Sequence, residues 1–202
     1  MGMQEDELPT KVKQIYEAVL SLMEEGADIN ALKVSDITTR AGIGKGTAYE
    51  YFENKEEIIG QAILYNMENV ICRIRQKSDE RSTFSEKFLC VLEWMDEKYQ
   101  PHQGFVPFIY IFRRWGELPF GIREKLIAGK DGICRIREDA LQLAKCGMEE
   151  GVLRKDLPDS LVSSIILSSI AAYAIFLGDE DQTVDKQFVR EFICEKVIRD
   201  LS

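Results

Sequence analysis

Hydrophobic residues recur every three or four positions along most of the chain, which is the spacing of one face of an α-helix. The pattern starts after Pro9, stops at Gly26, and then resumes in segments that glycine, proline or short polar stretches separate. No segment alternates hydrophobic and polar residues as a half-buried strand does. The pattern therefore predicts an all-α fold.

Two short helices are expected in the region that follows the first helix. One ends near Ala41 and the other opens after Gly44. Gly42, between them, suits a tight turn because a residue without a Cβ adopts positive φ at little cost. Two short helices joined in this way have the layout of a helix-turn-helix, whose second helix lies in the major groove of DNA.

The second short helix has an inward and an outward face. Ala48 and Phe52 are one turn apart and form an apolar face that packs inward. The opposite face, which carries Gly46 and Glu50, would meet DNA. In its first turn, residues 44–47, free backbone N–H groups favour phosphate oxygens. Glu50 is expected either to face solvent or to pair with a nearby basic residue.

A long helix is expected to connect this region to the rest of the chain. Asn54 followed by Glu57 has the form of a capping box, and hydrophobic positions then continue to Ile74 over about five turns. Such a helix is long enough to leave one domain and enter another. We therefore divide the chain into a helix-turn-helix domain, residues 1–54, and a larger helical domain, residues 55–202.

The larger domain is predicted from a series of segments between polar or helix-breaking stretches. A polar linker is expected first, then a helix, a short aromatic segment, and three further helices. The linker occupies residues 75–82, the first helix 83–99 and the aromatic segment 105–115. The three later helices occupy residues 131–150, 161–177 and 184–201.

The last two helices carry more apolar surface than one small domain easily covers. The helix at residues 161–177 is apolar nearly all round, and the helix at 184–201 has a broad apolar band. We predict that they pair with a second copy in a four-helix interface. The simpler alternative is that both helices are core of one monomer. The predicted dimer contacts are Ser164, Ser168, Ala172, Phe188 and Phe192.

Composition is that of an ordinary soluble protein, with 202 residues, 45% hydrophobic and 30% charged. No uninterrupted apolar run reaches the ~18 residues of a membrane-spanning helix, and no secretory signal opens the chain. These features predict a cytoplasmic protein that is not membrane-bound. The dispersed cysteines are expected to be reduced thiols, with redox sensing left open; they are Cys72, Cys90, Cys134, Cys146 and Cys194.

The charge is unusual for a DNA-binding protein. The formal net charge is −9, and residues 1–60 hold six Lys and Arg against twelve Asp and Glu. Between Lys33 and Lys55, however, four basic residues face three acidic ones. Bulk charge thus opposes non-specific adhesion to DNA, while the local balance allows docking at a specific site.

Catalysis has almost no support in the sequence. The single histidine, His102, stands beside Pro101 without a nucleophile pattern around it. No glycine-rich phosphate loop follows a strand, and no metal-ligand spacing occurs. We therefore predict no enzymatic activity, no cofactor and no metal site.

The helix-turn-helix stretch strongly resembles the DNA-binding domain of the tetracycline-repressor (TetR) family of bacterial transcription regulators. The resemblance is specific over roughly residues 10–60, and beyond them it rests on helix order and length. It is carried by Asp36-Ile37, Ala41-Gly42-Ile43, Lys45-Gly46-Thr47-Ala48-Tyr49 and Tyr51-Phe52-Glu53-Asn54-Lys55.

The resemblance implies which residues contact DNA. Tyr49, Tyr51 and Lys55 would hold the DNA backbone. Lys45, Gly46 and Thr47 would lie at or near the bases. Lys33 stands where such sequences usually have a capping Thr, so Ser35 is the alternative cap. Gly44 likewise stands in place of a capping Ser. The full predicted DNA-binding set is Lys33, Ser35, Gly44, Lys45, Gly46, Thr47, Tyr49, Tyr51 and Lys55.

The resemblance also implies a small-molecule inducer bound among the central helices, with aromatic residues as candidate pocket lining. These are Trp94, Phe108, Phe112, Trp115 and Tyr173. We therefore expect a ligand-responsive repressor that binds an inverted-repeat operator as a homodimer and is released by the inducer, with an activator left open. The alternative is an all-helical dimeric interaction protein that no longer binds DNA.

Overall fold

The computed structural model describes residues 8–100, 103–104, 116, 118–128, 133–178 and 183–202. Helices make up nearly all of this part of the chain, which confirms the all-α prediction. They are α1 (Thr10–Glu24), α2 (Val34–Ala41), α3 (Lys45–Tyr49), α4 (Lys55–Asp79), α5 (Phe84–Lys98), α7 (Phe120–Ala128), α8 (Ile133–Glu150), α9 (Asp159–Leu177) and α10 (Lys186–Leu201). Two strands of two residues each, β1 (Tyr99–Gln100) and β2 (Gln103–Gly104), pair antiparallel after α5.

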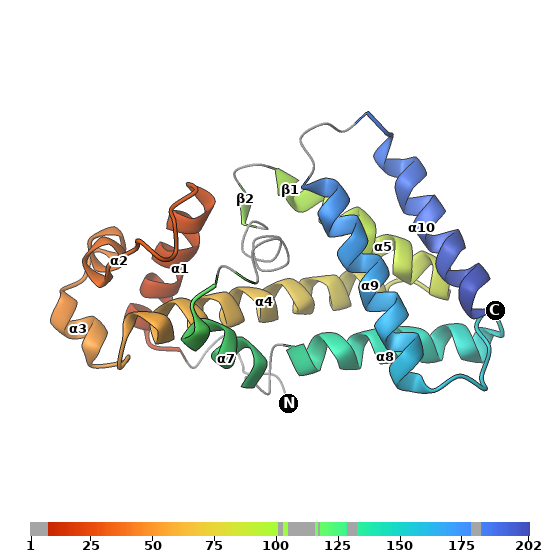
Figure 1. Cartoon of the computed structure of the whole chain (residues 1–202), viewed down its shortest axis with the longest axis horizontal. Helices are drawn as coiled ribbons and strands as arrows, with labels where there is room; N and C mark the ends of the chain where they lie inside the picture. Colours follow the sequence, from red (N-terminus) through yellow and green to blue (C-terminus); the bar gives the residue numbers. More distant parts are fainter. Residues whose placement is uncertain (1–7, 101–102, 105–115, 117, 129–132, 179–182) are drawn as a thin grey trace.

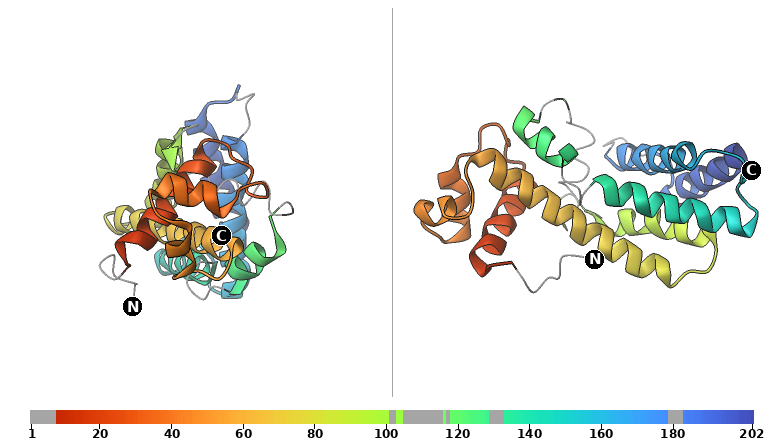
Figure 2. Two further views of the ribbon diagram at one scale, coloured as in Figure 1. Left: turned by 90° about the vertical axis from the view of Figure 1, so that its left-hand side faces the viewer. Right: turned by 90° about the horizontal axis from the view of Figure 1, so that it is seen from below.

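The helices form two groups that α4 connects. Helices α1, α2 and α3 lie together at one end of the molecule, and α5, α8, α9 and α10 form a bundle at the other (Figure 1). The long helix α4 begins beside α3 and runs into the bundle, as the view from below shows (Figure 2). Helix α7 packs against α4. A displacement of α4 would therefore change its packing against helices of both groups.

A first hydrophobic core holds α1, α2 and α3 against the first half of α4. Its largest fully buried members include Ile15, Ile37 and Ile58. Leu118, just before α7, and Ile122 within it also belong to this core. Hydrophobic contact thus extends beyond residue 54, and the division at residues 54 and 55 stays a prediction.

A second core lies inside the bundle and contains several large aromatic side chains. Phe84 and Phe88 of α5 stack with ring centroids 5.9 Å apart, and Tyr173 of α9 is fully buried in the same core. The Tyr173 hydroxyl donates to the Asp96 carboxylate, at 2.7 Å, and Arg190 of α10 forms an ion pair with the same carboxylate. This network ties α5, α9 and α10 together through their side chains.

The linker predicted at residues 75–82 is shorter in the structure because α4 continues to Asp79. No glycine or proline interrupts residues 75–79, so polarity alone did not end the helix. Only a few residues then separate α4 from α5. The predicted aromatic segment, residues 105–115, lies outside the described part of the chain.

Candidate DNA-binding and ligand-binding sites

The turn between α2 and α3 has the geometry that the sequence predicts. Gly42 adopts φ 68° and ψ 28°, a left-handed conformation that favours glycine. Its neighbour Ile43 donates its N–H to the carbonyl of Thr38, at 3.0 Å, which closes the end of α2. Gly44 then provides the extended N-cap of α3.

The start of α2 is capped differently from the expectation. The Asp36 carboxylate accepts from the backbone N–H of Lys33, at 3.0 Å. Ser35 lies inside the helix, and its hydroxyl points to the same carboxylate, 3.4 Å away. Ser35 is therefore not the cap. Asp36 holds the helix start through the reverse half of a capping box, in which the side chain three residues on bonds back to the N-cap.

Helix α3 presents its predicted faces correctly. Ala48 is fully buried and Phe52, just after the helix, is 6% exposed, so both pack inward. Tyr49 and Tyr51 are 49% and 42% exposed, although they are large aromatic residues. The Lys45 ammonium lies over the Tyr49 ring, 5.9 Å from its centroid. Both phenols are therefore open to solvent, and the Lys45 ammonium lies beside that of Tyr49.

The other predicted DNA contacts of the helix-turn-helix lie at the starts of its two helices. Lys33 and Ser35 are exposed at the start of α2, and residues 44–46 are exposed at the start of α3. Thr47 is half-buried. A Cβ added to Gly44 or Gly46 would meet no heavy atom within 4 Å, so both glycines face open space. The first turn of α3 is thus accessible to a DNA backbone.

Lys55 has a more structural position than the other predicted DNA contacts. It is the first residue of α4, is half-buried, and donates from Nζ to the backbone carbonyl of Asn30, at 3.0 Å. Asn54 caps the same helix by accepting from the N–H of Glu57, at 2.8 Å. Lys55 therefore joins α4 to the loop before α2, and the predicted cap at Asn54 is confirmed.

One ion pair fixes α2 against α1. The Arg40 guanidinium donates to both Glu25 carboxylate oxygens, at 2.6 and 2.5 Å, and to the Ser21 hydroxyl, at 2.7 Å. The hydrogen bonds from Arg40 hold the pKa of the Glu25 carboxyl below its usual value. Arg40 is thereby committed to positioning α2 on α1.

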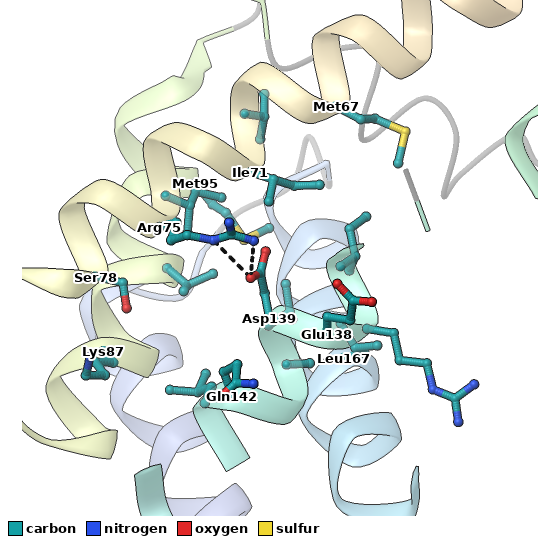
Figure 3. Close-up of a pocket in the computed structure, with 18 of the residues that line it drawn as sticks. Met67, Ile71, Arg75, Ser78, Lys87, Met95, Glu138, Asp139, Gln142 and Leu167 are labelled. Atoms are coloured by element: carbon teal, nitrogen blue, oxygen red, sulfur yellow. Dashed lines mark hydrogen bonds and ion pairs between the residues drawn. The ribbon is translucent and has the colours of Figure 1, made fainter. Parts of the chain in front are cut away.

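A cavity of about 1050 Å³ opens among α4, α5, α7, α8 and α9 (Figure 3). Its walls are mainly aliphatic, with a few charged and polar groups. The lining includes Met67, Ile71 and Ile74 of α4, Met95 of α5, Leu126 of α7, Ile136 and Leu143 of α8, and Leu167 and Ile170 of α9. This volume is at the upper end of typical ligand pockets, and such a lining suits a large ligand with an extended apolar part.

The cavity also contains polar groups at one end. Ser78 of α4, Lys87 of α5 and Gln142 of α8 lie together there (Figure 3). Cys146, one helical turn beyond Gln142, also lines the cavity, and its thiol donates to Glu150, at 3.2 Å. Burial and this hydrogen bond raise the pKa of the Cys146 thiol, which keeps it in the less reactive protonated form.

The aromatic residues that the sequence singled out do not line this cavity where the structure describes them. Trp94 is 3% exposed and Tyr173 fully buried, and both belong to the bundle core. Phe108, Phe112 and Trp115 lie outside the described residues. The cavity residues of α4 were missed because helical spacing predicts them equally well as core. The signal that could have found them is the continuation of that spacing to Ile74, beyond the first core.

The predicted dimer surface is exposed along α9 and α10. Ser164, Ser168 and Ala172 face solvent on α9, while Phe188 and Phe192 on α10 are 60% and 51% exposed and stack on each other. Cys194, also on α10, is instead buried in the bundle core. Helix α10 therefore has one face in the core and one aromatic face open to a partner.

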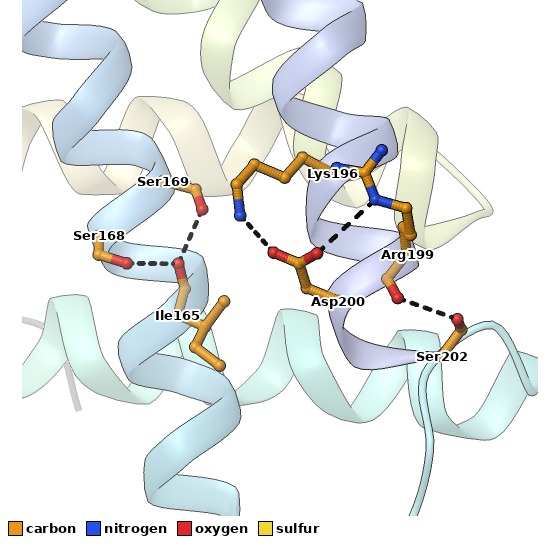
Figure 4. A network of polar contacts seen from close by, with 7 residues as sticks. All are labelled: Ile165, Ser168, Ser169, Lys196, Arg199, Asp200 and Ser202. Carbon is orange, nitrogen blue, oxygen red and sulfur yellow. Dashed lines mark hydrogen bonds and ion pairs between the residues drawn. The ribbon is translucent and has the colours of Figure 1, made fainter.

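The serine hydroxyls of α9 are satisfied within their own helix. Ser168 and Ser169 both donate to the carbonyl of Ile165, at 2.9 Å (Figure 4). Ser164 donates to the carbonyl of Ser160, at 2.7 Å. Because these hydroxyls already have acceptors, a partner could cover this face without leaving them unpaired. On α10, Lys196 and Arg199 form ion pairs with Asp200 near the chain end (Figure 4).

A family model described as bacterial regulatory proteins of the tetR family matches residues 15–62, which run from α1 into α4. The match covers both helices of the helix-turn-helix and the turn at Gly42. Residues 15–62 are therefore similar to the DNA-binding region of the TetR family.

One curated protein that this chain resembles is a regulator of fatty acid metabolism. The fatty acid metabolism regulator protein of Bacillus subtilis (strain 168) is 33% identical over 82 residues, which cover 41% of this chain and 42% of that protein. The match thus spans less than half the length of that relative.

Solved structures that resemble nearly the whole chain in fold include two transcriptional regulators. The transcriptional regulator FadR from Bacillus subtilis, in complex with stearoyl-CoA, is 20% identical with a TM-score of 0.74, covering 94% of this chain and 99% of that one. A TetR-family regulator from Cytophaga hutchinsonii is 19% identical with a TM-score of 0.75, covering 98% of each chain. At these identities the likeness establishes the fold alone.

Helix α9 is also long and apolar enough, by length and composition alone, to cross a membrane. A core helix of a soluble protein passes the same test. In the bundle, Val162, Ile166 and Tyr173 of α9 are fully buried against its neighbours, which accounts for much of its apolar character. Leu167 and Ile170 of the same helix line the cavity.

Proposed function

We propose that this chain is a ligand-responsive transcriptional regulator that binds an inverted-repeat operator as a homodimer and acts as a repressor. The observation that carries the proposal is a TetR-family helix-turn-helix with exposed Tyr49 and Tyr51, joined by one helix to a large aliphatic cavity. In a two-fold dimer, two α3 helices about one DNA turn apart would enter successive major grooves.

The cavity supports a long-chain acyl thioester as the ligand class. Its lining is mainly aliphatic, and its volume is about 1050 Å³. The Bacillus subtilis structure of the same fold holds stearoyl-CoA. An acyl chain would occupy the aliphatic part, where its burial is favourable by about 0.8 kcal/mol per CH₂ group.

Two residues connect the cavity to the DNA-binding end. Met67 of α4 and Leu126 of α7 line the cavity and also belong to the first core. A ligand that displaces them would shift α4 and α7 against α1. A coupling free energy of about 1 to 3 kcal/mol would weaken operator binding by roughly 5- to 150-fold.

DNA binding is tested with the full chain and DNA from upstream of its own gene, in gel shifts at several salt concentrations. Tyr49→Ala should weaken binding by about tenfold or more, because a hydrogen bond to a charged phosphate is worth about 1.5–3 kcal/mol. Lys13→Ala, at an exposed position of α1, is the control and should change binding little.

Two results would oppose the proposal. If the wild-type protein binds no duplex even at low salt, an interaction protein that has lost DNA binding is favoured. The negative net charge of residues 1–60 supports that alternative. Equal binding by wild type and Tyr49→Ala would remove α3 from the interface.

The homodimer is tested by sedimentation velocity. Replacing Phe188 and Phe192 by Ser should shift the protein toward monomer, because central aromatic residues of interfaces each contribute about 2 kcal/mol or more. Both side chains are exposed in the single chain, so the fold should persist. Phe120→Ser, at a residue of α7 that is 67% exposed, is the matched control. An unchanged dimer in the double variant would place the interface elsewhere.

A further inference from the structure

The cavity separates α4 from α8, and an ion pair crosses between them. Helix α4 packs on α1, α5 and α7, while α8 packs on α5 and α9. Arg75 of α4 donates from Nε and Nη2 to one oxygen of Asp139 on α8, at 3.1 and 2.5 Å (Figure 3). Both residues line the cavity.

The pair lies between the two ends of the cavity (Figure 3). The α4 residues that line it run from Met67 to Asp79, a length of about 18 Å at 1.5 Å per residue. Met67, at one end, adjoins the first core, and Ser78 and Lys87 lie at the other end. Arg137 and Glu138 of α8 also line the cavity, with Glu138 beside Leu167 and away from Ser78 and Lys87 (Figure 3). An amphipathic ligand that places its chain at the first end and its head at the second must pass Arg75 and Asp139.

We propose that the Arg75–Asp139 ion pair is a clasp between α4 and α8, which an amphipathic ligand with a long apolar chain opens. This inference rests on the proposed ligand-binding function. While closed, the clasp holds α4 against α8 beside the cavity. When a chain occupies the cavity, the clasp opens and α4 is released from α8.

The exposure of the two side chains suits a contact that opens and closes. The Arg75 side chain is 51% exposed and that of Asp139 is 31% exposed. Ion pairs at such positions stabilise a structure only modestly, because water solvates the separated charges. A ligand can therefore open the clasp at a small cost in affinity.

The test measures stearoyl-CoA binding and amide hydrogen exchange in the full chain. Asp139→Asn and Arg75→Gln should each strengthen stearoyl-CoA binding by roughly two- to fivefold, because the ligand no longer has to separate the pair. Exchange at residues 67–79 should become faster in both variants without ligand. The double variant Arg75→Asp/Asp139→Arg, which restores opposite charges, should return both measurements toward wild type.

Lys77→Gln is the matched control. Lys77 pairs with Glu97 at 2.8 Å and so joins α4 to α5, but neither residue lines the cavity. This variant should leave stearoyl-CoA binding unchanged. Weaker binding in Asp139→Asn and Arg75→Gln would overturn the clasp and make the pair a direct ligand contact. Unchanged binding and exchange in both variants would also overturn it.

Failure of the proposed ligand class gives a different result. If wild type and every variant fail to bind stearoyl-CoA, that ligand class is wrong. The exchange measurements then still decide whether Arg75 and Asp139 hold α4 to α8, with the charge-swapped double variant as the deciding sample.

Discussion

The two hydrophobic cores differ in how completely they are filled. The first core encloses fully buried side chains such as Ile15, Ile37 and Ile58 between short helices. The second adjoins a cavity of about 1050 Å³, which buried residues of the first core reach at Met67 and Leu126. Charged contacts at the second core, such as the one between Asp96 and Arg190, cross between helices. A well-packed region holds one geometry, whereas a region with unfilled space can rearrange around a ligand.

The largest expected effect is on stability, and it comes from a pair of substitutions that compares packing in the first core with packing at the cavity wall. Ile37→Ala in the first core should lower the free energy of unfolding by about 2–5 kcal/mol, because the side chain is fully buried. Ile71→Ala, at a half-buried residue that lines the cavity, should cost about 1 kcal/mol, since less packing is lost. Urea unfolding followed by circular dichroism measures both. Equal losses would show that the cavity wall is as tightly packed as the first core.

The same contrast explains how far sequence reasoning reached. The helix-turn-helix was predictable because it depends on local signals: a glycine at positive φ, a cap at Asn54, and apolar residues one turn apart. The cavity depends on how α4, α5, α8 and α9 pack together, which residue spacing does not determine. Arg75 and Asp139 are 64 positions apart, so no local pattern could pair them.

Helix boundaries also differ in how far local sequence signals determine them. Asp185 caps α10 by accepting from the N–H of Phe188, at 2.9 Å, so the helix starts two residues after the predicted position. The polar residues at the end of α4 remained helical because they face solvent or the cavity. Polarity marks the surface of a helix and does not by itself fix the residue at which the helix ends.

A second prediction uses matched N-caps in the two regions. Asn54→Ala and Asp185→Ala each remove one side-chain acceptor from a helix start, and each should cost about 1 kcal/mol of stability. Only Asn54→Ala should also weaken operator binding, because α4 starts beside α3 and carries Lys55. Thermal unfolding and gel shifts measure the two effects. If Asp185→Ala weakened operator binding equally, the start of α10 in the bundle would control the DNA-binding geometry as strongly as the start of α4 does.

The smallest expected effect is a pH dependence that differs between the regions. Hydrogen bonds from Arg40 lower the pKa of the Glu25 carboxyl in the folded state, so this contact stabilises the fold above the usual pKa of Glu and is lost as the pH falls through the folded value. In the other region, the hydrogen bond from Arg154 lowers the pKa of Asp156 to about 2, so that contact is fully lost only below this pH.

Acid unfolding of Glu25→Gln and Asp156→Asn separates these two contacts. Glu25→Gln should make the loss of stability with falling pH slightly shallower below the usual Glu pKa, because one carboxylate no longer takes up a proton on unfolding. Asp156→Asn should act in the same direction, but only between the usual Asp pKa and about pH 2. Both groups are solvent-exposed, so the changes should be small. A larger change for Asp156→Asn than for Glu25→Gln above the usual Asp pKa would mean that this local pair, rather than the one joining α1 to α2, limits acid stability.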